Sequence, residues 1–319
     1  MDDVGLAALG IAHRGLWTRR EALAVATRGT VDGFVRRGEW RTVWPGVLTD
    51  AGTVLDPWQR AHAAALACGA GAVVSGRTAA RLHRLPLIDD HDPATGAQEH
   101  LLDDVVSSGP RGLLRARDED GLVRVLRRCA ATLSSDEVVR TRTGLLVTSP
   151  LRTLVDCAGL LSLDALVCAL DRALHVHLVD EAALLRAVDD RSRSRSVERL
   201  RAAVALADRR AESPAETLTR LALLPTLPGF VPQVRLRAPD GRVLARYDLA
   251  DEELRLAVEA DGRAGHAGEQ MVAKDRCRDR MGERHGWRTE RVTWWELRCQ
   301  RTAFVARIAE VAAERRARA

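Results

Sequence analysis

Among the side chains in residues 246–266, RYDLADEELRLAVEADGRAGH, that are able to bind a metal or move a proton are Asp248, Glu259, Asp261 and His266. Clustered carboxylates repel one another and lose hydration unless a cation or a proton compensates. Their oxygens suit Mg²⁺ (or Mn²⁺), which takes one or two carboxylates and completes its shell with water and substrate phosphate. Such an ion can activate water and neutralise charge building on a phosphodiester. The histidine is then a candidate base or proton donor, although acids at strand ends can also simply solubilise a sheet edge.

The same stretch predicts two β-strands rather than a helix. In the strand from Leu254, alternation puts Glu259 and Asp261 on one face. A connecting loop over residues 251–256 places Asp248 directly across from Glu259. A tighter turn keeps the same face but slides the two acids four residues apart, about 13 Å at the rise of a strand, which is too far to share a metal.

The surrounding elements predict a self-contained α/β unit over residues 211–319. ESPAETLTRLALL begins a helix, with Ser213 and Glu216 in capping-box spacing and a proline in the first turn. The strands FVPQVRLR and RVLARYDL are separated by APDG, a hairpin-turn signal. The acid-bearing strand, a long charged helix over about residues 268–284, the strand GWRTERVT and a final helix complete the unit.

These residues together resemble a known family. Asp248, the EADG at residues 259–262, His266 and GWRTERVT look like the domain-of-unknown-function group related to very short patch repair endonucleases, within the PD-(D/E)xK nuclease superfamily. Glu216 matches the family's early Ser-Pro-x-Glu, and Gln233 matches a glutamine before its second strand. The resemblance covers residues 211–319 and implies a restriction-endonuclease-like α/β fold.

The resemblance also implies roles for individual residues. Asp248 and Glu259 would ligate the metal, with Asp261 beside them in the place of the superfamily's usual lysine. The repair endonucleases also lack that lysine and use histidine, so His266 is expected to substitute. Typical relatives carry an aromatic residue where this chain has Ala260.

Four further residues belong to the same resemblance. Glu216 would join the catalytic set, although helix capping explains it equally well. Gln233, Asp275 and Arg278 would support the site. Asp275 and Arg278 are also i, i+3 neighbours that could form only a surface salt bridge.

Residues 1–52 predict a winged helix-turn-helix. Thr18 and Glu21 form a capping box that opens one helix, and a second helix over about residues 30–37 ends at Gly38. WRTVWPGVLT supplies a strand, a Pro-Gly turn and a strand. Because the second helix of such a module enters the DNA major groove, the expected phosphate or base contacts are Arg28, Arg36, Arg37 and Arg41. A module of this size can instead serve only for docking.

Residues 53–210 predict a mixed α/β middle region. Two helices flank a short strand in residues 55–85, with Ser75 as the N-cap of the second, and Ser149-Pro150 opens another helix. Further helices are expected near residues 163–175, 180–189 and 196–209. The N-terminal part resembles the winged-helix domain of AbiEi-type antitoxins, and VTSPLRTLVD with the helices after it is similar to the region that often accompanies that domain. The expected fold class is therefore α+β and multidomain, with boundaries at 1–52, 53–210 and 211–319.

Composition limits the class of partner. The chain has 319 residues, 46% of them hydrophobic, enough to bury a core. No signal-peptide pattern and no apolar run of about 18 residues is present, so we expect a cytoplasmic protein with no membrane partner. The six cysteines form no C-x-x-C pair, which argues against a zinc knuckle or a disulfide framework. The net charge of +5 mildly favours a polyanionic partner.

The leading hypothesis is a DNA-binding protein whose winged helix places a Mg²⁺-dependent endonuclease-like domain on duplex DNA for phosphodiester hydrolysis. The alternative is a non-enzymatic AbiEi-like antitoxin or transcriptional regulator, with a toxin or other protein as partner, whose nuclease fold serves for binding or dimerisation. A third possibility is an interaction module without DNA contact, which a salt-sensitive affinity for duplex DNA would exclude.

Overall fold

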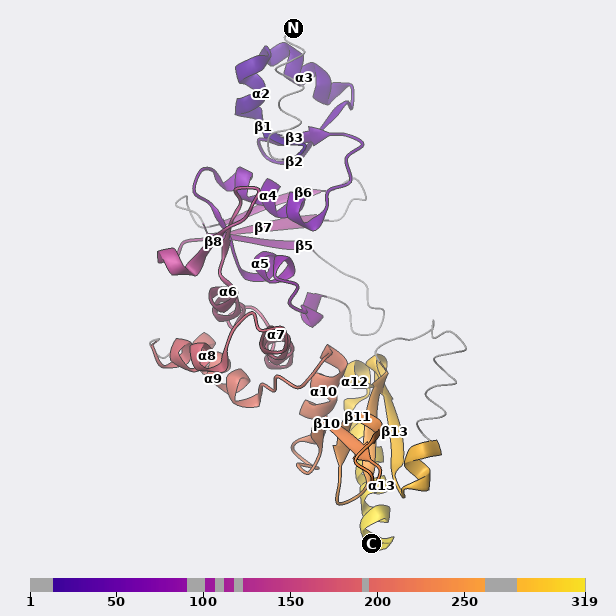
Figure 1. Ribbon diagram of the computed structural model, residues 1–319. Coiled ribbons are helices and arrows are strands. Elements are labelled where there is room, and N and C mark those ends of the chain that lie inside the picture. Colours follow the sequence, from indigo (N-terminus) through magenta and orange to yellow (C-terminus); the bar gives the residue numbers. More distant parts are fainter. Residues whose placement is uncertain are drawn as a thin grey trace. The chain divides into compact units, whose positions relative to one another are not determined.

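The computed structural model describes residues 14–90, 101–106, 112–117, 123–190, 195–261 and 280–318 (Figure 1). Contacts group the chain into two compact units. Apart from residues 91–97, the first unit extends to Leu161 and the second begins at Ser162. Both units combine helices with a sheet, so the predicted α+β class is confirmed at this level. Within the described ranges, no helix is both long and apolar enough to cross a membrane.

The first unit opens with two helices on a small sheet. Its elements are β1 (Leu16–Thr18), α2 (Arg19–Val25), α3 (Arg28–Arg36), β2 (Trp40–Trp44) and β3 (Val47–Asp50), with strand order β1-β3-β2. The predicted capping box is confirmed, because the Thr18 hydroxyl accepts from the Glu21 N–H and the Glu21 carboxylate accepts from the Thr18 N–H. Trp17 and Phe34 pack on Trp40 with ring centroids 4.9 and 4.6 Å away. These aromatic contacts hold α3 on the sheet.

The rest of the first unit is a six-stranded sheet with three helices. The strand order is β6-β7-β5-β4-β9-β8. The elements are α4 (Pro57–Cys68), β4 (Val73–Val74), α5 (Gly76–Leu82), η1 (Ile88–Asp90), β5 (Leu101–Val106), β6 (Gly112–Arg117), β7 (Val123–Cys129), η2 (Ser135–Glu137), β8 (Val138–Arg140), β9 (Leu146–Thr148) and α6 (Pro150–Cys157). Ser149 caps α6 as predicted by accepting from the Arg152 N–H, whereas Ser75 precedes α5 without a side-chain capping bond.

The second unit begins with α7 (Leu163–His175), α8 (Glu181–Asp189), α9 (Arg195–Leu206) and α10 (Pro214–Leu223), close to the predicted helices. A buried ion pair joins α7 to α10, since Arg220 donates to the Asp171 carboxylate at 2.8 Å. Thr217 donates to the same carboxylate, also at 2.8 Å. The predicted boundary between residues 210 and 211 therefore falls inside one compact unit.

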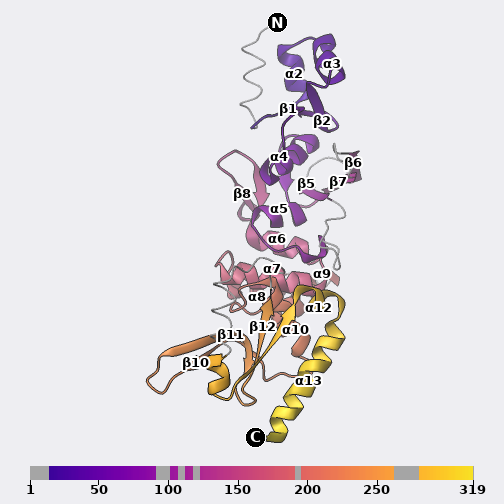
Figure 2. The ribbon, with the colours of Figure 1, turned by 90° about the vertical axis from the view of Figure 1, so that its right-hand side faces the viewer.

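A four-stranded sheet of order β10-β11-β12-β13 follows α10. Its strands are β10 (Val231–Arg237), β11 (Val243–Asp251), β12 (Leu256–Asp261) and β13 (Arg288–Thr293), and the last helices are α12 (Trp294–Cys299) and α13 (Arg301–Arg318). The first two strand pairs are antiparallel and β12 pairs with β13 in parallel. Figure 2 shows α13 running alongside this sheet. Of the long helix predicted over residues 268–284, only residues 280–284 fall within the described part of the chain, and they are helical.

Candidate active site

Strand register brings the predicted acids together in the second unit. Asp251 pairs with Leu256 and Leu249 pairs with Val258, so the wider of the two predicted turns is confirmed. The next pair in this register is Asp248 with Glu259. Glu259 is only 6% exposed, although its side chain carries an ionisable carboxyl group. Burying an acid in this way is costly unless a cation or a proton compensates.

The same row continues across the sheet on both sides. Gln233 lies between the pairs Pro232–Leu249 and Val234–Tyr247, which puts it opposite Asp248. On the other side, Glu259 pairs with Arg291 of β13. One transverse row therefore carries an amide, two carboxylates and a guanidinium.

The ladder between β11 and β12 ends at this row. Beyond the Leu249–Val258 pair, the Ala260 N–H donates to the Asp248 carboxylate at 3.0 Å. A side-chain oxygen thus takes the acceptor position that a neighbouring strand would normally supply. The hydrogen bond fixes the Asp248 carboxylate beside the backbone that follows Glu259.

Gln233 has an unusual backbone at the point opposite Asp248. Its φ is +60°, which is uncommon for a residue other than glycine and disfavours regular pleating. Its amide Nε2 donates to Glu216 Oε2 at 2.9 Å. Its Oε1 is buried and accepts no hydrogen bond from the residues described. An amide oxygen next to the carboxylates is therefore available as a further ligand or acceptor.

Glu216 joins this group from the first turn of α10 and is 8% exposed. Its Oε2 accepts from the Glu212 N–H at 2.9 Å as well as from Gln233. Burial raises the pKa of Glu216, the Glu212 N–H opposes that shift, and the charge of Asp248 raises the pKa further. Helix capping by Ser213, whose hydroxyl accepts from the Glu216 N–H, is present at the same time. The structure thus places Glu216 in the first turn of α10 beside Gln233, and the Ser213 half of the predicted capping box is present.

A guanidinium lies at the edge of this acidic group. Arg246 donates to both oxygens of Glu212 at 2.6 and 3.0 Å. The hydrogen bond to Glu212 raises the pKa of Arg246, and the charges of Asp248 and Glu216 act in the same direction. Neither Arg246 nor Arg291 was expected from the sequence. Their positions in the strands, two residues before Asp248 and opposite Glu259, become informative only once the register is known.

Of the other predicted acidic-site residues, only Asp261 lies within the described part of the chain. Asp261 ends β12, is exposed and pairs in register with Thr293. His266, Asp275 and Arg278 lie outside the described residues. Within the ranges that are described, no three His, Cys, Asp or Glu side chains form a cluster able to hold a metal on their own.

The two adjacent carboxylates nevertheless fit Mg²⁺ or Mn²⁺. Such ions are commonly held by one or two carboxylates, with water and substrate phosphate as the remaining ligands. Asp248 and Glu259 provide that number, and the buried Oε1 of Gln233 adds a hard oxygen in the same row. The pKa of Glu216 is raised mainly by burial, and the negative charge of Asp248 adds to the shift.

The four arginines predicted to contact DNA divide into two pairs. Arg28 and Arg36 lie on α3 at i and i+8, are exposed, and donate no hydrogen bond to the described residues. Arg37 is paired with Glu39 and lies 5.1 Å from the centre of the Phe34 ring. Arg41 is half-buried and donates to the Thr53 carbonyl at 2.6 Å. Only the first pair is free to bind a ligand without breaking an internal contact.

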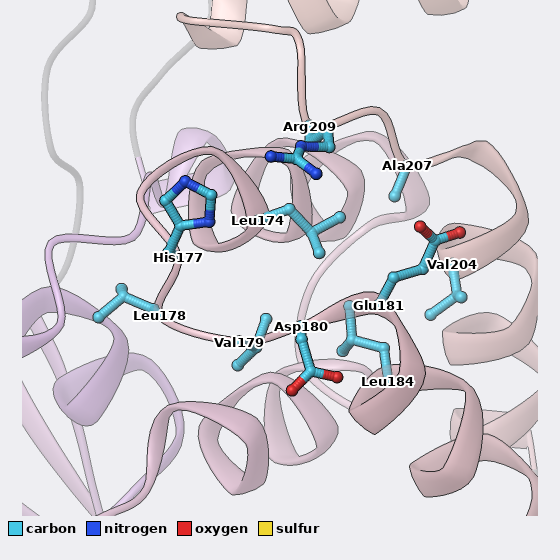
Figure 3. Close-up of a pocket in the computed structure, with 10 residues that line it drawn as sticks. All are labelled: Leu174, His177, Leu178, Val179, Asp180, Glu181, Leu184, Val204, Ala207 and Arg209. Atoms are coloured by element: carbon cyan, nitrogen blue, oxygen red, sulfur yellow. The ribbon is translucent and has the colours of Figure 1, made fainter.

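A separate pocket in the second unit contains none of the predicted site residues. It lies between α7, α8 and α9 and has a volume of about 290 Å³ (Figure 3). Its lining includes the apolar side chains of Leu174, Leu184 and Val204. It also includes the polar or charged side chains of His177, Glu181 and Arg209. The left-handed backbone of His177 follows from its place after α7, where the Leu178 N–H donates back to Ala173.

Comparisons with known proteins give relatives without an assigned function. No family model matches the chain. Two uncharacterized proteins, from two strains of Mycobacterium tuberculosis, are each 28% identical over 286 residues, covering 89% of this chain and 96% of each relative. The chain is therefore similar to these proteins over both of its units.

Proposed function

We propose that this protein binds DNA and that its second unit is a Mg²⁺-dependent phosphodiester hydrolase of the endonuclease type. The observation that carries the proposal is the row of Gln233, Asp248 and Glu259 across three strands, with Glu216 hydrogen-bonded to Gln233. These residues come from four elements and are buried or half-buried. Bringing like charges together costs stability, and a bound cation would offset that cost.

Asp248 and Glu259 would hold the metal, which when bound supplies a Lewis acid that activates water and offsets charge on the phosphate. Gln233 orients Glu216 through the amide contact at 2.9 Å. Glu216 is a candidate to take up or release a proton, because its raised pKa moves its titration toward neutral pH. The Ala260 N–H holds the Asp248 carboxylate in place.

The front of the first unit would place the chain on duplex DNA. Arg28 and Arg36 share one face of α3 with Asp32, whose carboxylate is paired with Arg19. Because Asp32 is neutralised from α2, the two outer arginines remain as surplus positive charge. Phosphate contacts from such arginines supply affinity that does not depend on sequence.

Cleavage of supercoiled plasmid tests the proposal, with Mg²⁺, Mn²⁺ or EDTA added to the wild type, Asp248→Asn and Glu259→Gln. We expect metal-dependent nicking that falls at least about a hundredfold in both variants, the scale on which loss of a charge-stabilising group slows catalysis. Glu253→Gln is the matched control, because Glu253 is an exposed acid in the turn between the same two strands. It should cleave like the wild type.

Two results would count against hydrolysis. Nicking that survives in Asp248→Asn and Glu259→Gln would place the activity elsewhere or in a contaminant. Intact plasmid across a panel of sequences, with duplex binding retained, would favour the non-enzymatic antitoxin or regulator. Stabilisation of the wild type, but not of Asp248→Asn, by Mn²⁺ in thermal unfolding would still identify the metal site.

A further inference from the structure

The hairpin formed by β10 and β11 is strongly basic. Residues 235–246 contain four arginines and a single acid, Asp240. All four arginines are exposed: Arg235, Arg237, Arg242 and Arg246. Figure 2 shows the hairpin extending away from α13. The hairpin therefore offers a concentrated positive surface on the strands that also carry Gln233 and Asp248.

Two of these arginines face each other directly. Arg235 and Arg246 are register partners in the antiparallel ladder, and residues so placed have Cβ atoms about 5 Å apart. Like charges in this position destabilise a sheet unless an anion lies between them. Glu212 binds Arg246 through both oxygens, while Arg235 makes no hydrogen bond or ion pair with the described residues. The Glu212 carboxylate thus pairs with only one of the two opposed guanidinium groups.

The missing negative charge is best supplied by phosphate. Guanidinium groups bind phosphate oxygens bidentately, and an opposed pair can hold one phosphate from two sides. Arg235 and Arg246 each lie two residues along their strands from Gln233 and Asp248, roughly 7 Å at the rise of a strand. A nucleic-acid backbone held by the arginines would bring a neighbouring phosphate to the acids.

We propose that the β10–β11 hairpin is a nucleic-acid-binding surface in its own right, on which Arg235 and Arg246 bind a backbone phosphate beside the acidic row. Glu212 occupies Arg246 in the free protein and gives way to the phosphate. The choice of nucleic acid as ligand rests on the proposed function.

Fluorescence anisotropy of a labelled DNA duplex tests the hairpin in EDTA, where no cleavage occurs. The full-length Arg235→Ala/Arg246→Ala variant should bind roughly tenfold or more weakly than the parent. Its salt dependence, the slope of log affinity against log salt, should fall by about 0.9, the contribution of the single phosphate that the two arginines share. The comparison is repeated in an Arg28→Ala/Arg36→Ala background, so that binding by α3 does not hide the effect.

Arg316→Ala/Arg318→Ala is the matched control, because it removes the same charge from exposed positions on α13 in the same unit. It should change the slope by much less. Glu212→Gln should strengthen binding, because it releases Arg246 while keeping the backbone N–H that donates to Glu216. If the salt bridge between Glu212 and Arg246 were merely structural, Glu212→Gln and Arg246→Ala would change the affinity for DNA in the same direction.

An unchanged slope in the double variant, or an equal loss in the control, would overturn the inference. Thermal unfolding of the variants reports any loss of folding. The Arg235→Lys/Arg246→Lys variant keeps the charge, so weaker binding by this variant reports the lost guanidinium contacts. Failure of the nuclease proposal can be distinguished from failure of the hairpin proposal. If the protein is not a nuclease, cleavage is absent but the hairpin still binds DNA. Unchanged affinity of the Arg235→Ala/Arg246→Ala variant for DNA, with metal-dependent plasmid cleavage retained, would overturn the hairpin proposal alone.

Discussion

At the scale of single residues, neutral backbone and amide donors hold the acidic group in place. Glu216 Oε2 accepts two hydrogen bonds, from the Glu212 N–H and Gln233 Nε2. Asp248 accepts a hydrogen bond from the Ala260 N–H. These donors orient the carboxylates without themselves adding a counter-charge.

Glu216→Gln should make stability less sensitive to pH. The raised folded pKa means that the folded state holds the proton of Glu216 better than the unfolded chain does. The wild type therefore loses stability as pH rises from the unfolded value of 4.5 through the raised folded pKa. Glutamine keeps the acceptor oxygen but not the titration. In urea unfolding, the free energy of unfolding of the variant should rise relative to that of the wild type between pH 4.5 and pH 8. An equal difference between the two proteins at both pH values would contradict this.

At the scale of elements, local signals and long-range contacts contributed differently. The Thr18–Glu21 capping box, the Ser213 N-cap, the turn at Asp240-Gly241 and the helix-opening prolines were predicted correctly, because each depends on residues within four positions. The Ser213–Glu216 capping box is only half formed, because the Glu216 carboxylate accepts from the Glu212 N–H instead. The sequence allowed two alternative turns between β11 and β12, and therefore two registers, since both satisfy the alternation of apolar residues. Packing of the whole sheet selected the turn that makes Asp248 and Glu259 neighbours.

The surface of α3 gives a prediction at this scale. Arg28→Ala/Arg36→Ala should weaken binding to duplex DNA and lower the salt slope by about 1.8, for two lost phosphate contacts. Arg115→Ala/Arg142→Ala removes the same charge from exposed positions elsewhere in the first unit and is the control. Arg41→Ala should mainly lower thermal stability, because Arg41 bonds the Thr53 carbonyl. Equal losses of affinity in the two double variants would argue against α3 as the contact surface.

At the scale of the whole molecule, the division of the chain follows buried charge as much as apolar packing. Asp171 is 1% exposed and is hydrogen-bonded by Arg220, Thr217 and the Asp208 N–H. Burial raises the pKa of Asp171 even though Arg220 opposes the shift. These contacts tie α7 to α10, so the helices from residue 162 onward belong to the unit that carries the acids.

Asp171→Asn should destabilise the second unit by about 3–5 kcal/mol, because Arg220 would be left buried without its counter-charge. Asp164→Asn is the control: its pair with Arg301 is partly exposed, with about a third of each side chain accessible, and such pairs contribute about 0–1 kcal/mol. Denaturant unfolding measures both. If Asp171→Asn and Asp164→Asn both lowered the free energy of unfolding by a similarly small amount, the contact between α7 and α10 would contribute little to stability.

The sequence by itself determined most of the elements with their approximate ends, and which residues have the chemistry for a metal site. Those properties depend on neighbours along the chain, through hydrogen bonds and side-chain periods of a few residues. Only the tertiary structure decided that Gln233 faces Asp248, that Glu216 is held by Gln233, and that Arg235 opposes Arg246. Each of these contacts joins residues 11 to 17 positions apart, and many partners at such distances satisfy the local rules equally well. Packing selects among them because a sheet can adopt only one register and a buried charge must find compensation.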